Sequence, residues 1–241
     1  MGKLYLKPMV EFHGSLMMAF IVYVSGGNGI AVVWGLFMCV VAAGAAFFNP
    51  CISLASLFRE LNQTHHPWTK SLETVLCMMT QILGYLVGGL IGWAVEGDTL
   101  AILINPDKDK AQAFFTEVVW TGQLILTLMI IKDLKTWKDP HWVAIFSVII
   151  TVWVMANMAH PISGACFNPT QCITLNIIHY IHTGDDSVLD HLWVYAFAPL
   201  IGTMVAAGAA GALRTKASKP MNEVHEINQL KGEEDAEENQ H

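Results

Sequence analysis

Two of the three Asn-Pro dipeptides in this chain, Asn49-Pro50 and Asn168-Pro169, have the residue types and the context to do chemistry. An Asn side chain readily caps a helix and Pro suits the first helical position, so each dipeptide predicts the start of a short helix. Both follow apolar stretches long enough to lie in a membrane. A helix N-terminus at bilayer depth points partial positive charge and free N–H groups at whatever passes, which indicates a pore.

The composition indicates an integral membrane protein, because 54% of the 241 residues are hydrophobic and only 14% are charged. Six apolar segments each approach the ~20 residues that a spanning helix needs. We therefore predict an all-α membrane protein with six transmembrane helices and two re-entrant half-helices. The predicted spans are residues 9–26, 30–46, 72–95, 113–131, 142–159 and 192–213.

Charge predicts the orientation and a separate tail. If both termini are cytosolic, eleven Lys and Arg residues fall inside and only Lys108 and Lys110 fall outside. We expect residues 1–213 to form the membrane domain and residues 214–241 to form a polar, acidic cytosolic tail that does not fold alone. This tail either remains solvated or binds a cytosolic partner.

The order of elements predicts an inverted repeat. Each half reads span, span, Asn-Pro loop, span, and three spans per half turn the second copy upside down, so the two loops enter from opposite faces. The repeats cover about residues 9–95 and 113–213. Glu11 and Glu117 occupy equivalent places in the first span of each half. Ionisable residues inside a span need a reason: either they accept hydrogen bonds from loop N–H groups, the interpretation that we favour, or they relay protons.

Other polar and aromatic residues suggest plainer roles. The five cysteines fit neither a zinc site nor a disulfide framework, so they are interpreted as reduced small hydrophobes. No nucleotide loop, metal-ligand cluster or nucleophile arrangement is present, which predicts no enzyme activity, no cofactor, no bound metal and no nucleic-acid partner. Aromatic residues near the span ends are interpreted as interfacial anchors; they are Trp68, Trp137, Trp142, Trp193 and Tyr195.

The chain resembles the aquaporin, or major intrinsic protein, family over residues 9–213. The resemblance rests on both Asn-Pro loops and on Glu11 and Glu117; it also includes residues 81–84 and 193–202. It implies a homotetramer in the lipid bilayer in which each subunit has its own pore. It also implies passive flow of water or small neutral solutes, with the amides of Asn49 and Asn168 donating to the oxygen of the central molecule.

Several positions depart from the family pattern. The usual Ala after Asn49-Pro50 and after Asn168-Pro169 is replaced by Cys51 and Thr170, and Gln171 stands where the family usually has a selectivity-filter Arg. The resemblance also implies filter positions at Ala156, where water-selective members usually carry His, and at Ala165. The second-span filter position is either Trp34 or Gly29. Cys166, two residues before Asn168, is a possible mercurial site.

These departures leave the permeant open. Loss of the Arg and a small residue at position 156 suggest a wider aperture, so we expect passage of water and of small neutral solutes such as glycerol, urea, ammonia or peroxide. One alternative is a poorly conducting scaffold or junction protein on the same fold. Another is a weakly ion-conducting channel, because a fixed cation is missing. The membrane can be the plasma membrane or an intracellular one.

Overall fold

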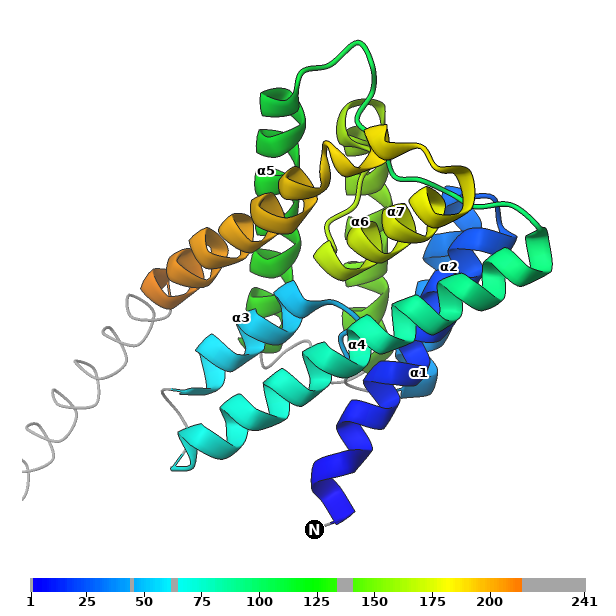
Figure 1. Cartoon of the computed structure of the whole chain (residues 1–241). Helices are drawn as coiled ribbons and strands as arrows, with labels where there is room; N and C mark the ends of the chain where they lie inside the picture. Colours follow the sequence, from blue (N-terminus) through cyan, green and yellow to red (C-terminus); the bar gives the residue numbers. More distant parts are fainter. Residues whose placement is uncertain (1, 44–45, 62–64, 134–140, 214–241) are drawn as a thin grey trace, which may run out of the picture. The chain divides into compact units, whose positions relative to one another are not determined.

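The computed structural model describes residues 2–43, 46–61, 65–133 and 141–213 of the chain (Figure 1). Every regular element in these ranges is helical, and the acidic tail predicted at 214–241 lies outside them. A final helix covers residues 192–213. The labelled elements before it are α1 (Gly2–Val24), α2 (Gly29–Ala43), α3 (Pro50–Leu61), α4 (Pro67–Glu96), α5 (Lys110–Asp133), α6 (His141–Ser163), α7 (Pro169–Thr183) and the 3-10 helix η2 (Asp186–Leu189).

The six predicted spans correspond to α1, α2, α4, α5, α6 and the final helix. By length and composition, four of the described helical segments can cross a membrane: residues 67–96, 110–131, 145–163 and 186–213. Helix α2 is apolar but has only 15 residues. Helix α1 is long enough, with 23 residues, but Lys7, Glu11 and His13 lower its mean hydropathy. An all-helical membrane protein is confirmed.

Helices α3 and α7 begin at Asn49-Pro50 and Asn168-Pro169, as predicted, whereas the third Asn-Pro dipeptide, Asn105-Pro106, lies in the segment between α4 and α5 and begins no helix. The side-chain oxygen of Asn49 accepts the N–H of Cys51 at 2.9 Å. Asn168, in an extended conformation, accepts the N–H of Gln171 at 3.4 Å, and Pro169 is the first helical residue. The helices are 12 and 15 residues long. Their starts at Asn49-Pro50 and Asn168-Pro169 match the predicted half-helices, whereas length alone does not distinguish them from α2, which also has 15 residues.

Small residues let α4 lie directly against α1. A Cβ atom added at Gly84 would meet the carbonyl oxygen of Phe12, and one added at Gly88 would meet the carbonyl oxygen of Leu16. The same contact recurs in the second half, where Gly202 of the final helix lies against the carbonyl oxygen of Val118 in α5. In a membrane, helices associate largely through such close backbone contact, so equivalent glycines set the helix pairing in both repeats.

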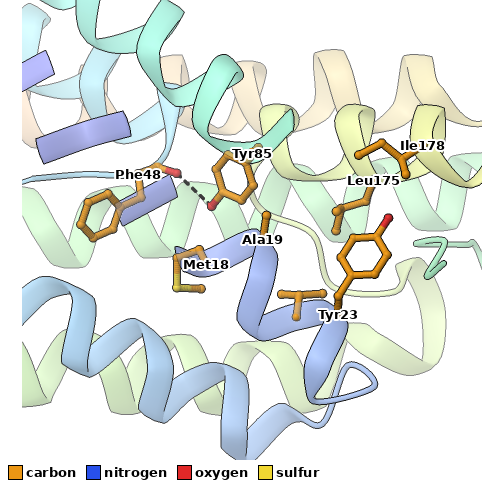
Figure 2. Packing of buried hydrophobic residues seen from close by; sticks show 8 residues of the cluster. Met18, Ala19, Tyr23, Phe48, Tyr85, Leu175 and Ile178 are labelled. Atoms are coloured by element: carbon orange, nitrogen blue, oxygen red, sulfur yellow. Dashed lines mark hydrogen bonds between the residues drawn. The ribbon is translucent and has the colours of Figure 1, made fainter. Parts of the chain in front are cut away.

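A buried cluster joins α1 and α4 to α7 and to the first Asn-Pro loop (Figure 2). Phe48, from the loop, belongs to the same cluster as Met18 and Ala19 of α1 and Tyr85 of α4, and its carbonyl oxygen faces the Tyr85 hydroxyl. Gly14 leaves the space that the Phe48 ring fills, because a Cβ atom there would overlap that ring. The loop is therefore seated in the core by its own aromatic side chain.

Enlarging Gly88 should separate α1 from α4. We expect Gly88→Leu to lower the stability of the purified protein by at least the ~1–3 kcal/mol typical of overpacking, because the new side chain meets backbone that cannot move aside. Thermal unfolding in detergent measures the effect. Gly29→Ala is the matched control, since a Cβ atom at that position meets nothing within 4 Å. Equal melting temperatures for the two variants would contradict the packing.

Candidate functional site

The residues before the two Asn-Pro dipeptides have an unusual backbone. Phe48 and Phe167 hold φ angles of 54° and 53°, in the left-handed region that non-glycine residues rarely occupy. Such a conformation costs on the order of 1–3 kcal/mol and persists only where the surroundings enforce it. Here it turns the N–H of each Phe in one direction and its C=O in another, and both groups have partners.

Glu11, in α1, binds the first loop. Its two carboxyl oxygens accept the N–H of Phe47 at 2.9 Å and the N–H of Phe48 at 2.8 Å. The side chain of Gln81, in α4, donates to the same carboxyl group at 2.8 Å and to the Ser53 hydroxyl at 3.0 Å. Glu11 is fully buried, and burying a carboxyl group in a span costs free energy. Its three hydrogen-bond donors offset that cost.

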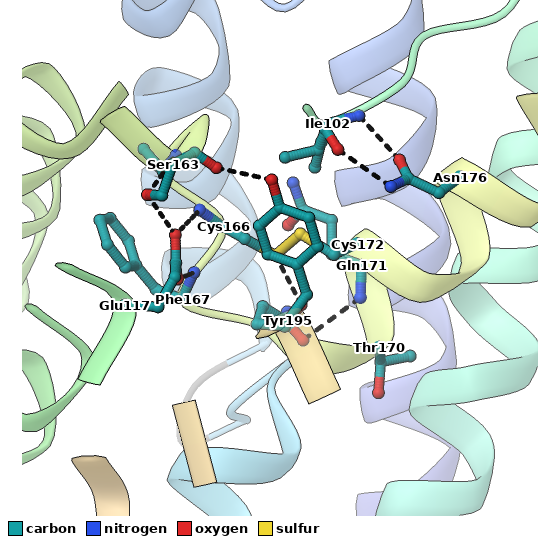
Figure 3. The surroundings of a disulfide bond; sticks show 12 residues. Ile102, Glu117, Ser163, Cys166, Phe167, Thr170, Gln171, Cys172, Asn176 and Tyr195 are labelled. Carbon is teal, nitrogen blue, oxygen red and sulfur yellow. Dashed lines mark hydrogen bonds between the residues drawn. A yellow bond between two sulfur atoms is a disulfide. The ribbon is translucent and has the colours of Figure 1, made fainter. Parts of the chain in front are cut away.

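Glu117, in α5, does the same for the second loop (Figure 3). It accepts the N–H of Cys166 at 3.0 Å and the N–H of Phe167 at 2.8 Å. The Ser163 hydroxyl donates to it at 2.6 Å, and Tyr195 of the final helix donates to the Ser163 carbonyl oxygen at 2.8 Å. The two equivalent carboxyl groups thus accept hydrogen bonds from loop N–H groups that have no partner within a helix. This is the arrangement expected if Glu11 and Glu117 support the loops.

The carbonyl groups of the same two Phe residues reach across to the opposite repeat. The amide nitrogen of Asn49 donates to Phe167 O at 2.8 Å, and that of Asn168 donates to Phe48 O at 2.8 Å. Each Asn therefore caps its own half-helix with its oxygen and links to the other loop with its nitrogen. Both side chains retain 6% exposure, so they are nearly but not fully enclosed.

The structure adds one residue to this centre that sequence reasoning missed. Tyr85 of α4 is 1% exposed, and its hydroxyl oxygen lies 2.9 Å from the Asn168 nitrogen and 3.1 Å from Phe48 O. The same oxygen lies 3.4 Å from Oε1 of Gln171. The sequence offered one signal for this role, the position of Tyr85 directly after Gly84 in the third span. A Tyr at such a position is, however, usually interpreted as an ordinary core residue.

The other motif residues lie close around the two helix starts. Pro50 and Cys51 are buried in α3, and Pro169 and Thr170 are buried in α7. The substitution at position 51 places a fully enclosed thiol in the first helical turn. Thr170 is 6% exposed, and its carbonyl oxygen accepts a bond from the Thr174 hydroxyl. Neither change disturbs the Asn cap of its helix.

The filter candidates fall into two groups. Ala156 of α6 and Ala165 of the second loop pack against the cluster that contains Phe167, and half-buried Gln171 lies in the first turn of α7. Trp34, by contrast, is 57% exposed and lies edge-to-face with Phe37 on an apolar groove of about 240 Å³ between α2 and α6. The second-span residues that pack against the buried cluster containing Phe48 and Tyr85 are instead Val32, Leu36, Cys39 and Val40.

Gly29, the other second-span candidate, is exposed at the first residue of α2. Neither Gly29 nor Trp34 belongs to the buried clusters around the two loops. The structure therefore brings together Ala156, Ala165 and the Asn-Pro loops, and it leaves both second-span candidates apart from them.

The cysteines require a correction. Cys166 and Cys172 are joined by a disulfide with a Cα–Cα distance of 6.1 Å, whereas Cys39, Cys51 and Cys77 are free (Figure 3). The expectation that all five are reduced is wrong for this pair, because the loop turns back and brings residue 166 beside the first turn of α7. A disulfide has no thiol, so a mercurial would react with Cys166 only after the bond to Cys172 is reduced.

One of the predicted interfacial anchors is also wrong. Tyr195 is fully buried and its hydroxyl holds Ser163, so it supports the second loop instead of facing the membrane surface. Trp68 and Trp193 are 87% and 43% exposed. Trp137 and the side chain of Trp142 lie outside the described residues.

The segment between α4 and α5 closes over the second half-helix. The backbone N–H of Ile102 donates to the side-chain oxygen of Asn176 at 2.7 Å, and the Asn176 nitrogen donates back to Ile102 O at 2.9 Å (Figure 3). Further along, Asn105 donates to the carbonyl oxygen of Pro161 in α6 at 2.8 Å. These bonds give an otherwise irregular segment partners on α6 and α7.

Together the fold and the site define a helical membrane protein of the channel class, built from two repeats whose half-helices begin at linked Asn-Pro loops. The chain belongs to the major intrinsic protein family, the aquaporins, because the family model matches residues 6–209. The family expected from the sequence is confirmed. Members of this family are channels for water and small solutes, not enzymes.

Known relatives agree with this assignment. The chain is 27% identical to the "Probable aquaporin NIP-type" of Nicotiana alata over 81% of its own length and 69% of the relative's. It is 25% identical to the "Glycerol uptake facilitator protein-like 6" of Lactiplantibacillus plantarum over 85% and 96% of the two chains. The crystal structure of an aquaglyceroporin from Plasmodium falciparum superposes with a TM-score of 0.69, covering 85% and 94%; at 19% identity this shows the shared fold.

Replacing either loop-binding carboxyl group should destabilise the protein. Gln has one acceptor oxygen and would turn an N–H toward a backbone N–H, so we expect Glu117→Gln and Glu11→Gln each to cost about 2 kcal/mol of stability. Thermal unfolding in detergent tests this, with Glu96→Gln as the control because Glu96 is exposed at the end of α4. A Glu117→Gln variant as stable as the control would contradict the structural role.

The disulfide predicts a labelling pattern. After denaturation without reductant, an alkylating reagent should modify Cys39, Cys51 and Cys77 alone, and after reduction it should modify all 5 cysteines. Intact mass measurement counts the labels, and digestion should yield residues 166 and 172 in one linked species. Five labels without reductant would show that the pair is reduced.

Proposed function

We propose that the protein is a passive channel for water and small neutral solutes. The observation that carries this proposal is the pair of Asn-Pro half-helices whose loops are linked by the Asn amides. Two helix N-termini then direct partial positive charge at the same point, which disfavours cations and protons while it leaves neutral molecules unopposed. The amide nitrogen of Asn49, with a second N–H available, is the donor that would orient a passing oxygen.

We infer that the solutes extend beyond water. We call the part of the pore lined by the filter candidates Ala156, Ala165 and Gln171 the outer constriction. Gln171, in the first turn of α7, gives it an uncharged amide in place of a guanidinium group, and Ala156 and Ala165 keep it free of large side chains. A glycerol facilitator among the relatives supports this inference. Glycerol, urea, ammonia and peroxide are the neutral molecules of suitable size and hydrogen-bonding capacity.

The assembly and orientation follow from the same proposal. We infer a homotetramer with one pore per subunit and with both termini in the cytosol, where the acidic tail at 214–241 can reach a cytosolic partner. Lys7 and Lys70, both assigned to the cytosolic side, lie 3.2 Å and 3.4 Å from the Glu73 carboxyl oxygens, which supports a shared side for these residues. Either the plasma membrane or an intracellular membrane is compatible with this arrangement.

Stopped-flow swelling and shrinking of proteoliposomes tests the proposal. The native chain should conduct water and at least one of glycerol and urea above empty liposomes. Gln171→Arg should keep water flow but reduce solute flow by about tenfold or more, the discrimination that a small steric difference in a pocket can give. Gln112→Arg, which adds the same charge at an exposed position at the start of α5, should leave both flows unchanged.

Two outcomes would contradict the proposal. Flow no faster than in empty liposomes would favour the poorly conducting scaffold on the same fold. Electrical conductance across a planar bilayer, lost in Gln171→Arg, would favour the ion channel.

A further inference from the structure

Among the described residues, Tyr85 has the only side-chain hydroxyl that forms hydrogen bonds with both Asn-Pro loops, through Phe48 and Asn168. Its ring is packed in the buried cluster with Met18, Ala19 and Phe48, so the hydroxyl is held in one place (Figure 2). The hydroxyl oxygen accepts from Asn168 at 2.9 Å and lies 3.1 Å from Phe48 O. It therefore stands at the point where the second half-helix begins.

Counting donors shows the consequence. A primary amide has two N–H groups. Asn168 donates both N–H groups to the protein, one to Phe48 O and one to the Tyr85 hydroxyl oxygen. Asn49 spends one on Phe167 O, and its second N–H has no partner among the residues that the structure describes. The two amides, equivalent by the repeat, thus differ in what they can offer a passing molecule.

The asymmetry comes from one residue. Tyr85 follows Gly84 as Thr203 follows Gly202, at equivalent places in the two repeats. The Thr203 hydroxyl donates to Pro199 O in its own helix at 2.8 Å, so it is already used there. Across the repeats the Thr203 side chain is a hydrogen-bond partner of the Cys51 thiol and not of the Asn49 amide, so no hydroxyl equivalent to that of Tyr85 lies against Asn49 among the described residues.

We propose that the Tyr85 hydroxyl occupies the position of a permeant oxygen at Asn168 and is a rate- and specificity-determining residue of the pore. This inference rests on the channel function proposed above. A water molecule at the centre finds a free donor at Asn49, but at Asn168 it must displace the hydroxyl or pass without that hydrogen bond. Larger polyols must displace more of the Tyr85 ring, so the residue favours the smallest neutral permeants.

Gln171 fits this arrangement. A phenol hydroxyl has one hydrogen to donate. Tyr85 therefore donates either to Phe48 O or to Oε1 of Gln171, which lies 3.4 Å away. An amide oxygen can accept that hydrogen, whereas a guanidinium group has no acceptor. Gln171 and Tyr85 are therefore chemically matched, and the hydroxyl connects the outer constriction to the centre of the pore.

Removing one oxygen atom tests the inference. Tyr85→Phe keeps the ring and frees the second N–H of Asn168, so water permeability per reconstituted channel should rise about fivefold, the factor that corresponds to one net hydrogen bond. Tyr23→Phe is the matched control. Tyr23 belongs to the same buried cluster, but its hydroxyl has no hydrogen-bond partner among the described residues, so its loss should leave permeability unchanged.

Each outcome decides the question. Stopped-flow rates are normalised to the amount of folded protein, and Tyr85→Met replaces Tyr85→Phe if the latter does not fold. Water flow that is unchanged or slower in a folded Tyr85 variant, with a conducting native channel, would overturn the inference and leave the proposed function standing. If the native chain and Tyr23→Phe do not conduct, a conducting Tyr85 variant supports the block by Tyr85, whereas an inert one overturns both proposals.

Discussion

Two buried carboxyl groups hold the consecutive N–H groups of two loops, and the rest of the site depends on them. Inside a membrane an unpaired N–H cannot turn to water, so an irregular loop survives there only if the protein supplies acceptors. Glu11 and Glu117 supply them from α1 and α5. With their N–H groups held, Phe48 and Phe167 can keep a left-handed backbone, which directs their carbonyl groups to the opposite repeat.

The linked loops explain why the half-helices meet where they do. Each Asn is fixed twice, by its oxygen to its own helix and by its nitrogen to the other loop. The Asn side chain is short, so these hydrogen bonds form only when the two loops lie close together in one relative position. The two helix N-termini are consequently held in a common register, which is the condition for their partial charges to act on one passing molecule.

The two repeats share this frame but differ around it. The first relies on Gln81 of α4 to support its carboxyl group, and the second relies on Ser163, which Tyr195 holds in turn. The second loop also carries a disulfide between residues 166 and 172, which encloses Asn168 and Gln171 in a closed ring of backbone. Restricting that segment limits the conformations from which Asn168 can donate.

The sequence by itself determined the spans, the two helix starts and the family, because hydropathy, Asn caps and Pro at the first helical position are local signals that survive without tertiary context. It also pointed to both carboxyl groups, since a buried charge in a span is conspicuous. Only the tertiary structure decided which atoms Tyr85 and Tyr195 touch and that residues 166 and 172 are joined. These contacts depend on how separate helices and a turned loop pack in space, and an aromatic or a Cys in an apolar helix carries no sign of its partner.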